Sequence, residues 1–223
     1  MPNWKLLGEA LIPGTGQTMY LYQGKDDFSI KLARGQELMN SRKHGSEDAL
    51  GELPCRRLKN SRQARVLVGG MGMGFTLAAA LRSTGSEAEI TVAELVPEVI
   101  EWNRGPLGEL SGRPLDDPRT RVYVGDVARL LKQHTAYFDV IALDIDNGPE
   151  GLTRSSNNWM YSVMGVACAQ NALKPGGVLA YWSAAPDDDF QDLLKSCGLL
   201  VDPVKVYAHG NKGARHTLWL ASY

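Results

Sequence analysis

The stretch RVLVGGMGMG, residues Arg65–Gly74, sets the architecture of this chain. It reads as a short apolar strand that enters a glycine-rich turn, and Phe75–Arg82 then has the composition of a helix. Glycine lets a backbone turn tightly and approach a ligand with no Cβ in the way, and a helix begins with free N–H groups. The pattern predicts a ligand site at the carboxyl end of a parallel strand.

The spacing of the glycines narrows the class of ligand. Gly70-x-Gly72-x-Gly74 is followed directly by Phe75, so the G-x-G-x-x-G pattern of dinucleotide sites is not met. A dehydrogenase is therefore disfavoured. The shorter spacing suits a nucleoside that has no pyrophosphate to bind, although a tight turn with close packing would also explain a glycine cluster.

Strands and helices alternate from this motif onward. After Arg65 we expect strands at 65–68, 89–93, 121–124, 138–143, 178–182, 204–207 and 217–221, with helices at 75–82, 97–103, 127–132, 159–173 and 188–196. Strands that are apolar throughout and alternate with helices indicate a parallel sheet covered on both faces. The sequence predicts an α/β fold with a doubly wound, mostly parallel, Rossmann-like sheet.

The first 60 residues have a different character. Short strands at 4–12, 18–22 and 28–33 are separated by turn residues, and a helix is expected from Ser46 to about Leu58. We expect two domains, 1–60 with a small antiparallel β unit and 61–223 with the ligand site. The oligomeric state is open, and a homodimer through the edges of the small sheet is the candidate arrangement.

Composition excludes several classes of protein. The chain of 223 residues has a net charge of -1, which gives no electrostatic footprint for nucleic acid or an anionic membrane. The three cysteines are widely spaced and favour reduced thiols. No Cys/His cluster has zinc-ligand spacing, so no metal is expected. No signal peptide or membrane-spanning run is apparent, and we expect a cytoplasmic protein.

Acidic residues follow the second and third predicted strands. Glu94 ends the strand about 20 residues after the glycines, where a carboxylate can accept hydrogen bonds from ribose hydroxyls. Gly125-Asp126-Val127 ends the next strand. Asp126 can accept from an amino group on a base while Val127 forms an apolar wall. A helix N-cap is the competing interpretation of Asp126, and the two roles are compatible.

Two carboxylates and an amide follow the fourth strand, at Asp144, Asp146 and Asn147. They are candidates for holding an amine, orienting it and taking its proton. The competing interpretation is an Asx-turn that begins a loop.

Together these motifs resemble the spermidine synthase family, within the class I S-adenosylmethionine-dependent methyltransferase fold. The resemblance covers most of the chain from Arg65 to Trp182. It rests on VLV at 66–68, the glycine turn, AELVPEV at 93–99, DPR at 117–119, VGD at 124–126, FDVI at 138–141 and LKPGG at 173–177.

The resemblance implies roles for individual residues. Asp144 falls at the family's catalytic aspartate, assisted by Asp146 or Asn147. Glu47 and Glu52 fall in a substrate-binding segment, and Tyr161 falls where the family has an aromatic residue near the substrate, although core packing explains it equally. The implied cofactor-binding residues are Gly70, Met71, Gly72, Met73, Gly74, Glu94, Leu95, Gly125, Asp126, Val127 and Asp144.

Departures from the family pattern direct the choice of reaction. Met73 replaces an aspartate that lies by the cofactor's aminopropyl arm, and its loss removes an obstacle to the carboxylate of intact S-adenosylmethionine. Leu50 and Gly51 replace a tyrosine and a histidine of the substrate-binding segment, and Asn147 replaces a second aspartate. A polyamine is a chain of cations, and binding it requires several carboxylates or aromatic faces. This site offers fewer such groups than the family's site.

We therefore expect an S-adenosylmethionine-dependent methyltransferase with an unidentified small-molecule acceptor. The alternative is an aminopropyltransferase that uses decarboxylated S-adenosylmethionine and an amine. A third hypothesis is a nucleoside-binding protein without catalysis.

Overall fold

Two β-sheets and their helices make up the computed structural model, which describes residues 4–33, 35–144, 157–209 and 212–223. The small sheet has the order β1-β2-β3-β4 and the large one β10-β11-β9-β8-β5-β6-β7. The strands are β1 (Lys5–Leu11), β2 (Thr18–Gln23), β3 (Phe28–Leu32), β4 (Glu37–Asn40), β5 (Arg65–Gly69), β6 (Glu89–Glu94), β7 (Thr120–Val124), β8 (Phe138–Leu143), β9 (Leu173–Ser183), β10 (Leu200–His209) and β11 (Lys212–Ser222).

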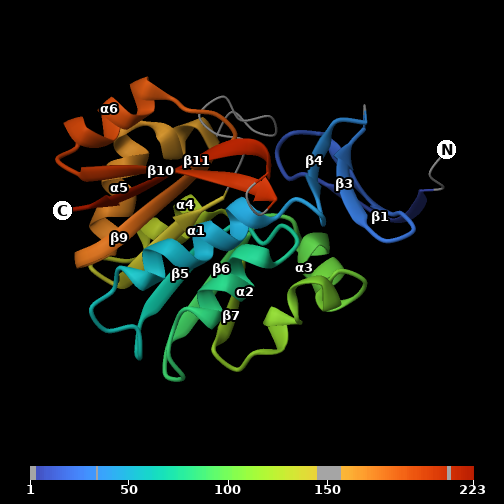
Figure 1. The fold of residues 1–223 in the computed structure, drawn as a ribbon, viewed down its shortest axis with the longest axis horizontal. Coiled ribbons are helices and arrows are strands. Elements are labelled where there is room, and N and C mark those ends of the chain that lie inside the picture. Colours follow the sequence, from blue (N-terminus) through green and yellow to red (C-terminus); the bar gives the residue numbers. More distant parts are fainter. Residues whose placement is uncertain (1–3, 34, 145–156, 210–211) are drawn as a thin grey trace.

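Helices cover both faces of the large sheet (Figure 1). One face packs against α1 (Gly45–Arg56), α2 (Phe75–Arg82) and α3 (Pro97–Arg104), and the other against α4 (Val127–Lys132), α5 (Val163–Ala172) and α6 (Asp188–Ser196). Short 3-10 helices lie at Gly108–Ser111, Pro114–Asp116 and Asn157–Tyr161. Because both faces are covered, the central strands are apolar along their whole length.

The pairing of the strands confirms the predicted fold class. The pairs β5–β6, β5–β8, β6–β7 and β8–β9 are parallel. At one edge, β11 runs antiparallel to both β9 and β10. The chain is thus an α/β protein with a mostly parallel seven-stranded sheet and a separate antiparallel N-terminal sheet.

The small sheet stands beside the end of the large one, near α3 (Figure 1). A Cβ built on Gly8 of β1 would lie 2.7 Å from Nε1 of Trp102 on α3, so only glycine permits this close approach. Helix α1 packs against α2 and also contacts β10. The N-terminal part of the chain therefore contacts the elements that hold the ligand site.

Several element boundaries differ from the sequence expectation. Strand β4 was not expected, because its four residues carry a charged residue at one end and an amide at the other. The helix expected at 159–173 begins only after Ser162, whose hydroxyl accepts from Gly165 N at 3.3 Å. Its last expected residue, Leu173, instead begins the longer strand β9.

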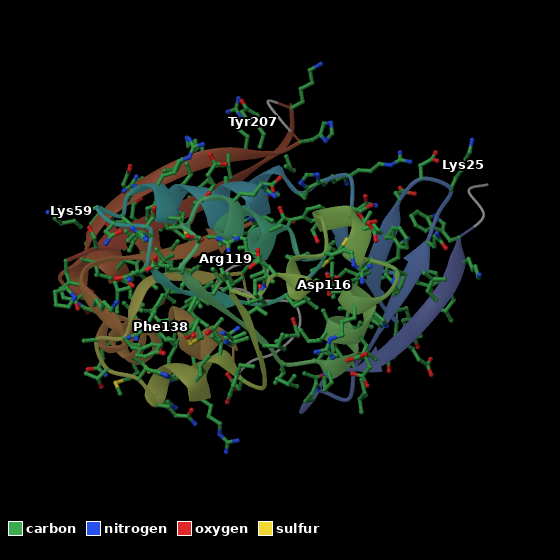
Figure 2. All side chains as sticks on the ribbon, turned by 90° about the horizontal axis from the view of Figure 1, so that it is seen from below. Lys25, Lys59, Asp116, Arg119, Phe138 and Tyr207 are labelled. Carbon is green, nitrogen blue, oxygen red and sulfur yellow. The ribbon has the colours of Figure 1, made fainter. Side chains whose placement is uncertain are left out.

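The Asp117-Pro118-Arg119 motif has a structural role here. Arg119, labelled in Figure 2, donates through Nη1 to the carbonyl oxygens of Leu81 at 3.1 Å, Thr84 at 3.3 Å and Gly85 at 3.1 Å. The Arg119 side chain also lowers the pKa of the Asp117 carboxyl by hydrogen bonding. These contacts fasten the segment before β7 to the end of α2.

Candidate active site

A cavity of about 660 Å³ opens at the carboxyl ends of the parallel strands. Its walls come from the ends of β5, β6, β7, β8 and β9, from the N-terminal sheet, from α1 and from the β10–β11 hairpin. Its volume lies in the usual range for small-molecule sites. Nine predicted site residues line it, namely Glu47, Gly70, Gly72, Glu94, Leu95, Gly125, Asp126, Val127 and Asp144.

The glycine turn forms the floor of this cavity. Gly70, Gly72 and Gly74 have φ angles of 94°, 51° and 85°, a region that residues with a Cβ rarely adopt. Gly74 is the N-cap residue of α2. The turn therefore brings backbone, rather than side chains, to the cavity surface.

Glu94 is a buried carboxylate held by backbone donors. Its Oε2 accepts from Met71 N at 2.9 Å and its Oε1 accepts from Val96 N at 2.8 Å. Burial raises the pKa of Glu94, while these backbone hydrogen bonds act in the opposite direction. Backbone donors therefore hold both oxygens of this carboxylate in place at the wall of the cavity.

Asp126 has the N-cap role that the sequence offered, and its role toward a base stays a prediction. Its Oδ1 accepts from Ala128 N at 2.9 Å and so caps α4. The residue also lines the cavity, next to Val127. The cap holds the carboxylate in one orientation, as binding a base would require.

Met71 and Met73 lie at a small hollow of about 20 Å³ rather than in the main cavity. Both side chains are buried, with Met73 4% exposed. Glu47 and Asp144 line this hollow as well as the main cavity. Two carboxylates therefore stand at the end of the site where Met73 replaces the family's aspartate.

Glu47 belongs to a hydrogen-bonded group that joins α1 to β11. Ser46 Oγ donates to Glu47 Oε2 at 2.6 Å, and Nδ1 of His216 lies 2.8 Å from the same hydroxyl. Burial raises the pKa of Glu47 and lowers the pKa of His216. His216 lines the cavity. Its ring packs edge to face with the ring of Trp182, and the two ring centroids are 4.8 Å apart.

Other predicted residues lie away from the cavity or outside the described residues. Glu52 pairs with Arg56 at 2.5 Å on the outer part of α1. Tyr161 is buried beside Tyr181 and donates to the carbonyl oxygen of Trp182 at 3.4 Å, just behind the cavity wall. Their substrate roles stay predictions. Asp146 and Asn147 lie outside the described residues.

Leu50 and Gly51, which stand where the family has a tyrosine and a histidine, face the protein interior. Leu50 is fully buried, and a Cβ on Gly51 would lie 2.2 Å from the carbonyl oxygen of Thr76 on α2. In this chain the two positions serve the contact between α1 and α2, which only a glycine at residue 51 allows.

The cavity includes residues that the sequence did not indicate. They come from β4 and the segment after it, from the end of β9 and from the C-terminal hairpin, and include Glu37, Met39, Lys43, Trp182 and His216. Trp182 lies near the end of a parallel strand, so the strand-end argument applies to it and could have found it. The others lie on antiparallel strands or a connection, for which no such rule exists.

Among the described residues, no group of three or more His, Cys, Asp or Glu side chains gathers as ligands for a metal ion. Within the same part of the chain, every helix is too short or too polar to span a membrane.

The sequence matches known proteins of one family. Residues 43–208 match the spermine/spermidine synthase domain. A polyamine aminopropyltransferase of Mycobacterium tuberculosis (strain CDC 1551 / Oshkosh) is 32% identical over 152 residues, or 64% of this chain and 28% of that protein. One from Sulfolobus acidocaldarius is 26% identical over 121 residues, or 54% of this chain and 39% of that protein. The match thus spans well under half of these relatives.

Solved structures share the fold. A spermidine synthase in complex with the transition-state analogue AdoDATO superposes with a TM-score of 0.75 at 18% identity, over 98% of this chain and 72% of that chain. The spermidine synthase from Thermotoga maritima gives a TM-score of 0.75 at 19% identity, with the same coverage.

The prediction of a methyltransferase is wrong, because the matching domain and the curated relatives are those of polyamine aminopropyltransferases. The inference from Met73 failed because it treated one position in isolation. Glu47 and Asp144, from other elements, line the same hollow, so the absence of one aspartate does not leave it without acidic side chains.

The predicted resemblance is confirmed, and this chain belongs to the spermine/spermidine synthase family.

Proposed function

We propose that this chain transfers an aminopropyl group from decarboxylated S-adenosylmethionine to a small amine. The observation that carries this proposal is the distribution of carboxylates in one cavity. Glu94 and Asp126 lie at the ends of β6 and β7, and Glu47 and Asp144 lie around the hollow by the glycine turn. The first pair suits a nucleoside, and the second pair suits a cationic amine.

The residues of the first region fit the nucleoside part of the molecule. Gly70 and Gly72 present backbone where a Cβ would intrude. The held carboxylate of Glu94 is placed to accept from ribose hydroxyls, as in other nucleotide sites of this architecture. Asp126 accepts from the amino group of the base, and Leu95 and Val127 cover its faces. The buried Nε1 of Trp182 has no hydrogen-bond partner among the described residues, which leaves a donor for a ligand group.

The residues of the second region serve the acceptor. The sulfonium group of the bound nucleoside supplies the electrophilic carbon. Asp144 holds and orients the amine, and a neighbouring base removes its proton, because only a neutral amine has a lone pair for attack. Asp146 or Asn147 assists Asp144 in this proposal. Alignment of the two reactants supplies much of the rate.

The choice of the decarboxylated donor rests on charge. Glu47 and Asp144 attract the terminal ammonium group of an aminopropyl arm and repel a carboxylate at the same place. Polyamine aminopropyltransferases among the curated relatives support this choice. The division at residues 60 and 61, a cytoplasmic location and a homodimer are further proposals from the sequence.

The experiment is a transfer assay with purified protein. Decarboxylated S-adenosylmethionine and intact S-adenosylmethionine are each incubated with a panel of diamines and polyamines, and mass spectrometry follows the nucleoside thioether and the alkylated amine. We expect amine-dependent release of the thioether from the decarboxylated donor only. Tight nucleoside binding with no transfer to any amine would overturn the proposal and favour a non-catalytic nucleoside-binding protein.

A further inference from the structure

His216 stands at the same edge of the sheet as Asp144. Leu143 pairs with Tyr181 between β8 and β9, and Trp182 pairs with Leu218 between β9 and β11. Side chains two residues apart on a strand share a face, so His216 lies on the face of Leu218, toward α1. Asp144, Trp182 and His216 all line the cavity, on three neighbouring strands of the large sheet.

The hydrogen bonds behind His216 determine which ring nitrogen carries a proton. Ser46 is fully buried, and its hydroxyl has a single proton to donate. That proton goes to Glu47 Oε2 at 2.6 Å when the carboxylate is ionised. The oxygen of Ser46 can then only accept from Nδ1 of His216, 2.8 Å away. The ring is thereby held with the proton on Nδ1 and a lone pair on Nε2.

We propose that Nε2 of His216 is the general base that removes the proton from the acceptor amine, and that Ser46 and Glu47 hold the ring in the required tautomer. This inference rests on the proposed function and assigns the neighbouring base that it requires. Asp144 remains the anchor of the amine. No motif of the sequence indicated His216 for this role.

The step balances in atoms and charge. The amine nitrogen forms the new bond to carbon, and the carbon–sulfur bond breaks with its electron pair going to sulfur. The proton that the nitrogen loses goes to Nε2 of His216. The ring then passes its Nδ1 proton to Ser46 as Ser46 passes its own proton to Glu47, which leaves the imidazole neutral again.

The surroundings of His216 favour a neutral ring that accepts protons. Burial lowers the pKa of His216, so the ring is uncharged when a cationic amine enters. The other charged groups that line the cavity on this side are Lys43 before α1, Glu47 on α1, Glu37 on β4 and Asp144 after β8.

A structural test determines the tautomer of the His216 ring directly. Protein labelled with ¹⁵N-histidine is studied by NMR at pH 8.5, because high pH favours the ionised form of Glu47, and the signals of His216 are assigned by their loss in His216→Gln. The chain has four histidines, so the assignment is tractable. We expect a protonated Nδ1 and an unprotonated Nε2 in the wild type, and a mixture of tautomers in Ser46→Ala. A wild-type ring protonated on Nε2 would overturn the inference.

A kinetic test measures how much the proposed proton transfer to His216 contributes to kcat. We expect His216→Ala to lower kcat by about 100-fold, the lower end of the usual range for general acid–base catalysis, with little change in the KM for the amine. Added imidazole restores at least part of the loss by entering the vacated space. His209→Ala is the matched control, because His209 lies on the same hairpin and its Nδ1 contacts the carbonyl oxygen of Arg42.

The outcomes separate this inference from the proposed function. A wild-type protein that alkylates no amine overturns the proposed function before any variant is compared, and the role as a base falls with it. An active wild type with His216→Ala or His216→Gln within about threefold of its kcat overturns the inference alone. Calorimetry of nucleoside binding shows that each variant is folded, and His216→Gln replaces the alanine variant if that one is not.

Discussion

The carbonyl oxygen of Asp144 lies 2.2 Å from the position that a Cβ on residue 70 would occupy. Gly70 follows β5 and Asp144 follows β8, and the two strands are parallel neighbours. Only glycine lets the two strand ends approach so closely. The residue that makes room for a nucleoside thus also sets the position of the backbone that carries the proposed acceptor anchor.

Gly70→Ala is therefore expected to destabilise the fold and to disrupt the site. The backbone conformation alone costs about 1–3 kcal/mol with a Cβ present, and displacement of Asp144 adds to this. Gly176→Ala is the matched control, because Gly176 has a φ of 77° with no atom within 4 Å of its Cβ position. Urea denaturation measures both variants. Equal losses in the two would show that the contact with Asp144 contributes nothing.

Asp144→Asn is expected to lower kcat/KM for the amine by about 100-fold, because the amide keeps the shape but cannot anchor and align a cation by charge. Binding of the nucleoside thioether, which has no aminopropyl arm, is retained in calorimetry. Asp192→Asn serves as the control, since Asp192 is an exposed residue of α6 paired with Lys195. Unchanged turnover in Asp144→Asn would remove this residue from the mechanism.

Glu94→Gln is expected to weaken nucleoside binding and to destabilise the protein by about 1–3 kcal/mol. The new NH₂ group would face either Met71 N or Val96 N, both of which donate to the carboxylate. One buried donor would then lose its acceptor. Denaturation and calorimetric titration check the two effects, and retention of both properties would refute the role of Glu94 as a held acceptor.

Stability should depend on pH through His216. Burial lowers the pKa of this imidazole below its ordinary value of about 6.5. As the pH falls through that value, the unfolded chain binds the proton first, so the free energy of unfolding decreases until the pH falls below the folded pKa. The side chain is only partly buried, so we expect a modest effect.

Urea denaturation at pH 7.5 and pH 5.5 tests this dependence. His216→Gln should lose less stability than the wild type between the two pH values. Glu47 and Glu94, whose pKa values are raised, act in the opposite direction in both proteins. Because Ser46 joins His216 to Glu47, the difference between the proteins measures the effect of His216 within this hydrogen-bonded group. Identical pH dependence in the two proteins would contradict the prediction.

A homodimer through the small sheet remains a prediction of the sequence. β1 is an edge strand, and it exposes 49% of Leu6 and 60% of Leu11. If this edge forms the contact, the double variant Leu6→Asp and Leu11→Asp should halve the mass measured by light scattering. Leu200→Asp, at an exposed leucine of β10, is the control. An unchanged mass in the double variant would exclude this contact.

Much of the large sheet follows from local sequence. The stretches 65–69 and 138–143 are largely apolar, and such runs form central parallel strands because both of their faces are buried. Glu94 and Asp126 were indicated because parallel strands end at one edge, where ligands bind. The small sheet was anticipated from turn residues, but β4 was not, because four residues with polar ends carry too little pattern.

The contribution of distant segments was not available from the sequence. His216 and Ser46 are 170 residues apart, and their contact depends on how α1 packs against the hairpin. The misleading inference from Met73 has the same cause. The charge at one place in a cavity is the sum over side chains from several elements, and one position of one motif does not reveal that sum.

The sequence by itself determined the fold class, the glycine turn and the family, because strand periodicity, backbone freedom and motif order are local properties of the chain. The tertiary structure alone decided which side chains share the cavity. It placed Glu47 and Asp144 around one hollow, buried Leu50 in the interior and brought His216 to Ser46. Those contacts depend on packing between elements far apart in the chain, and packing is a property of the folded whole.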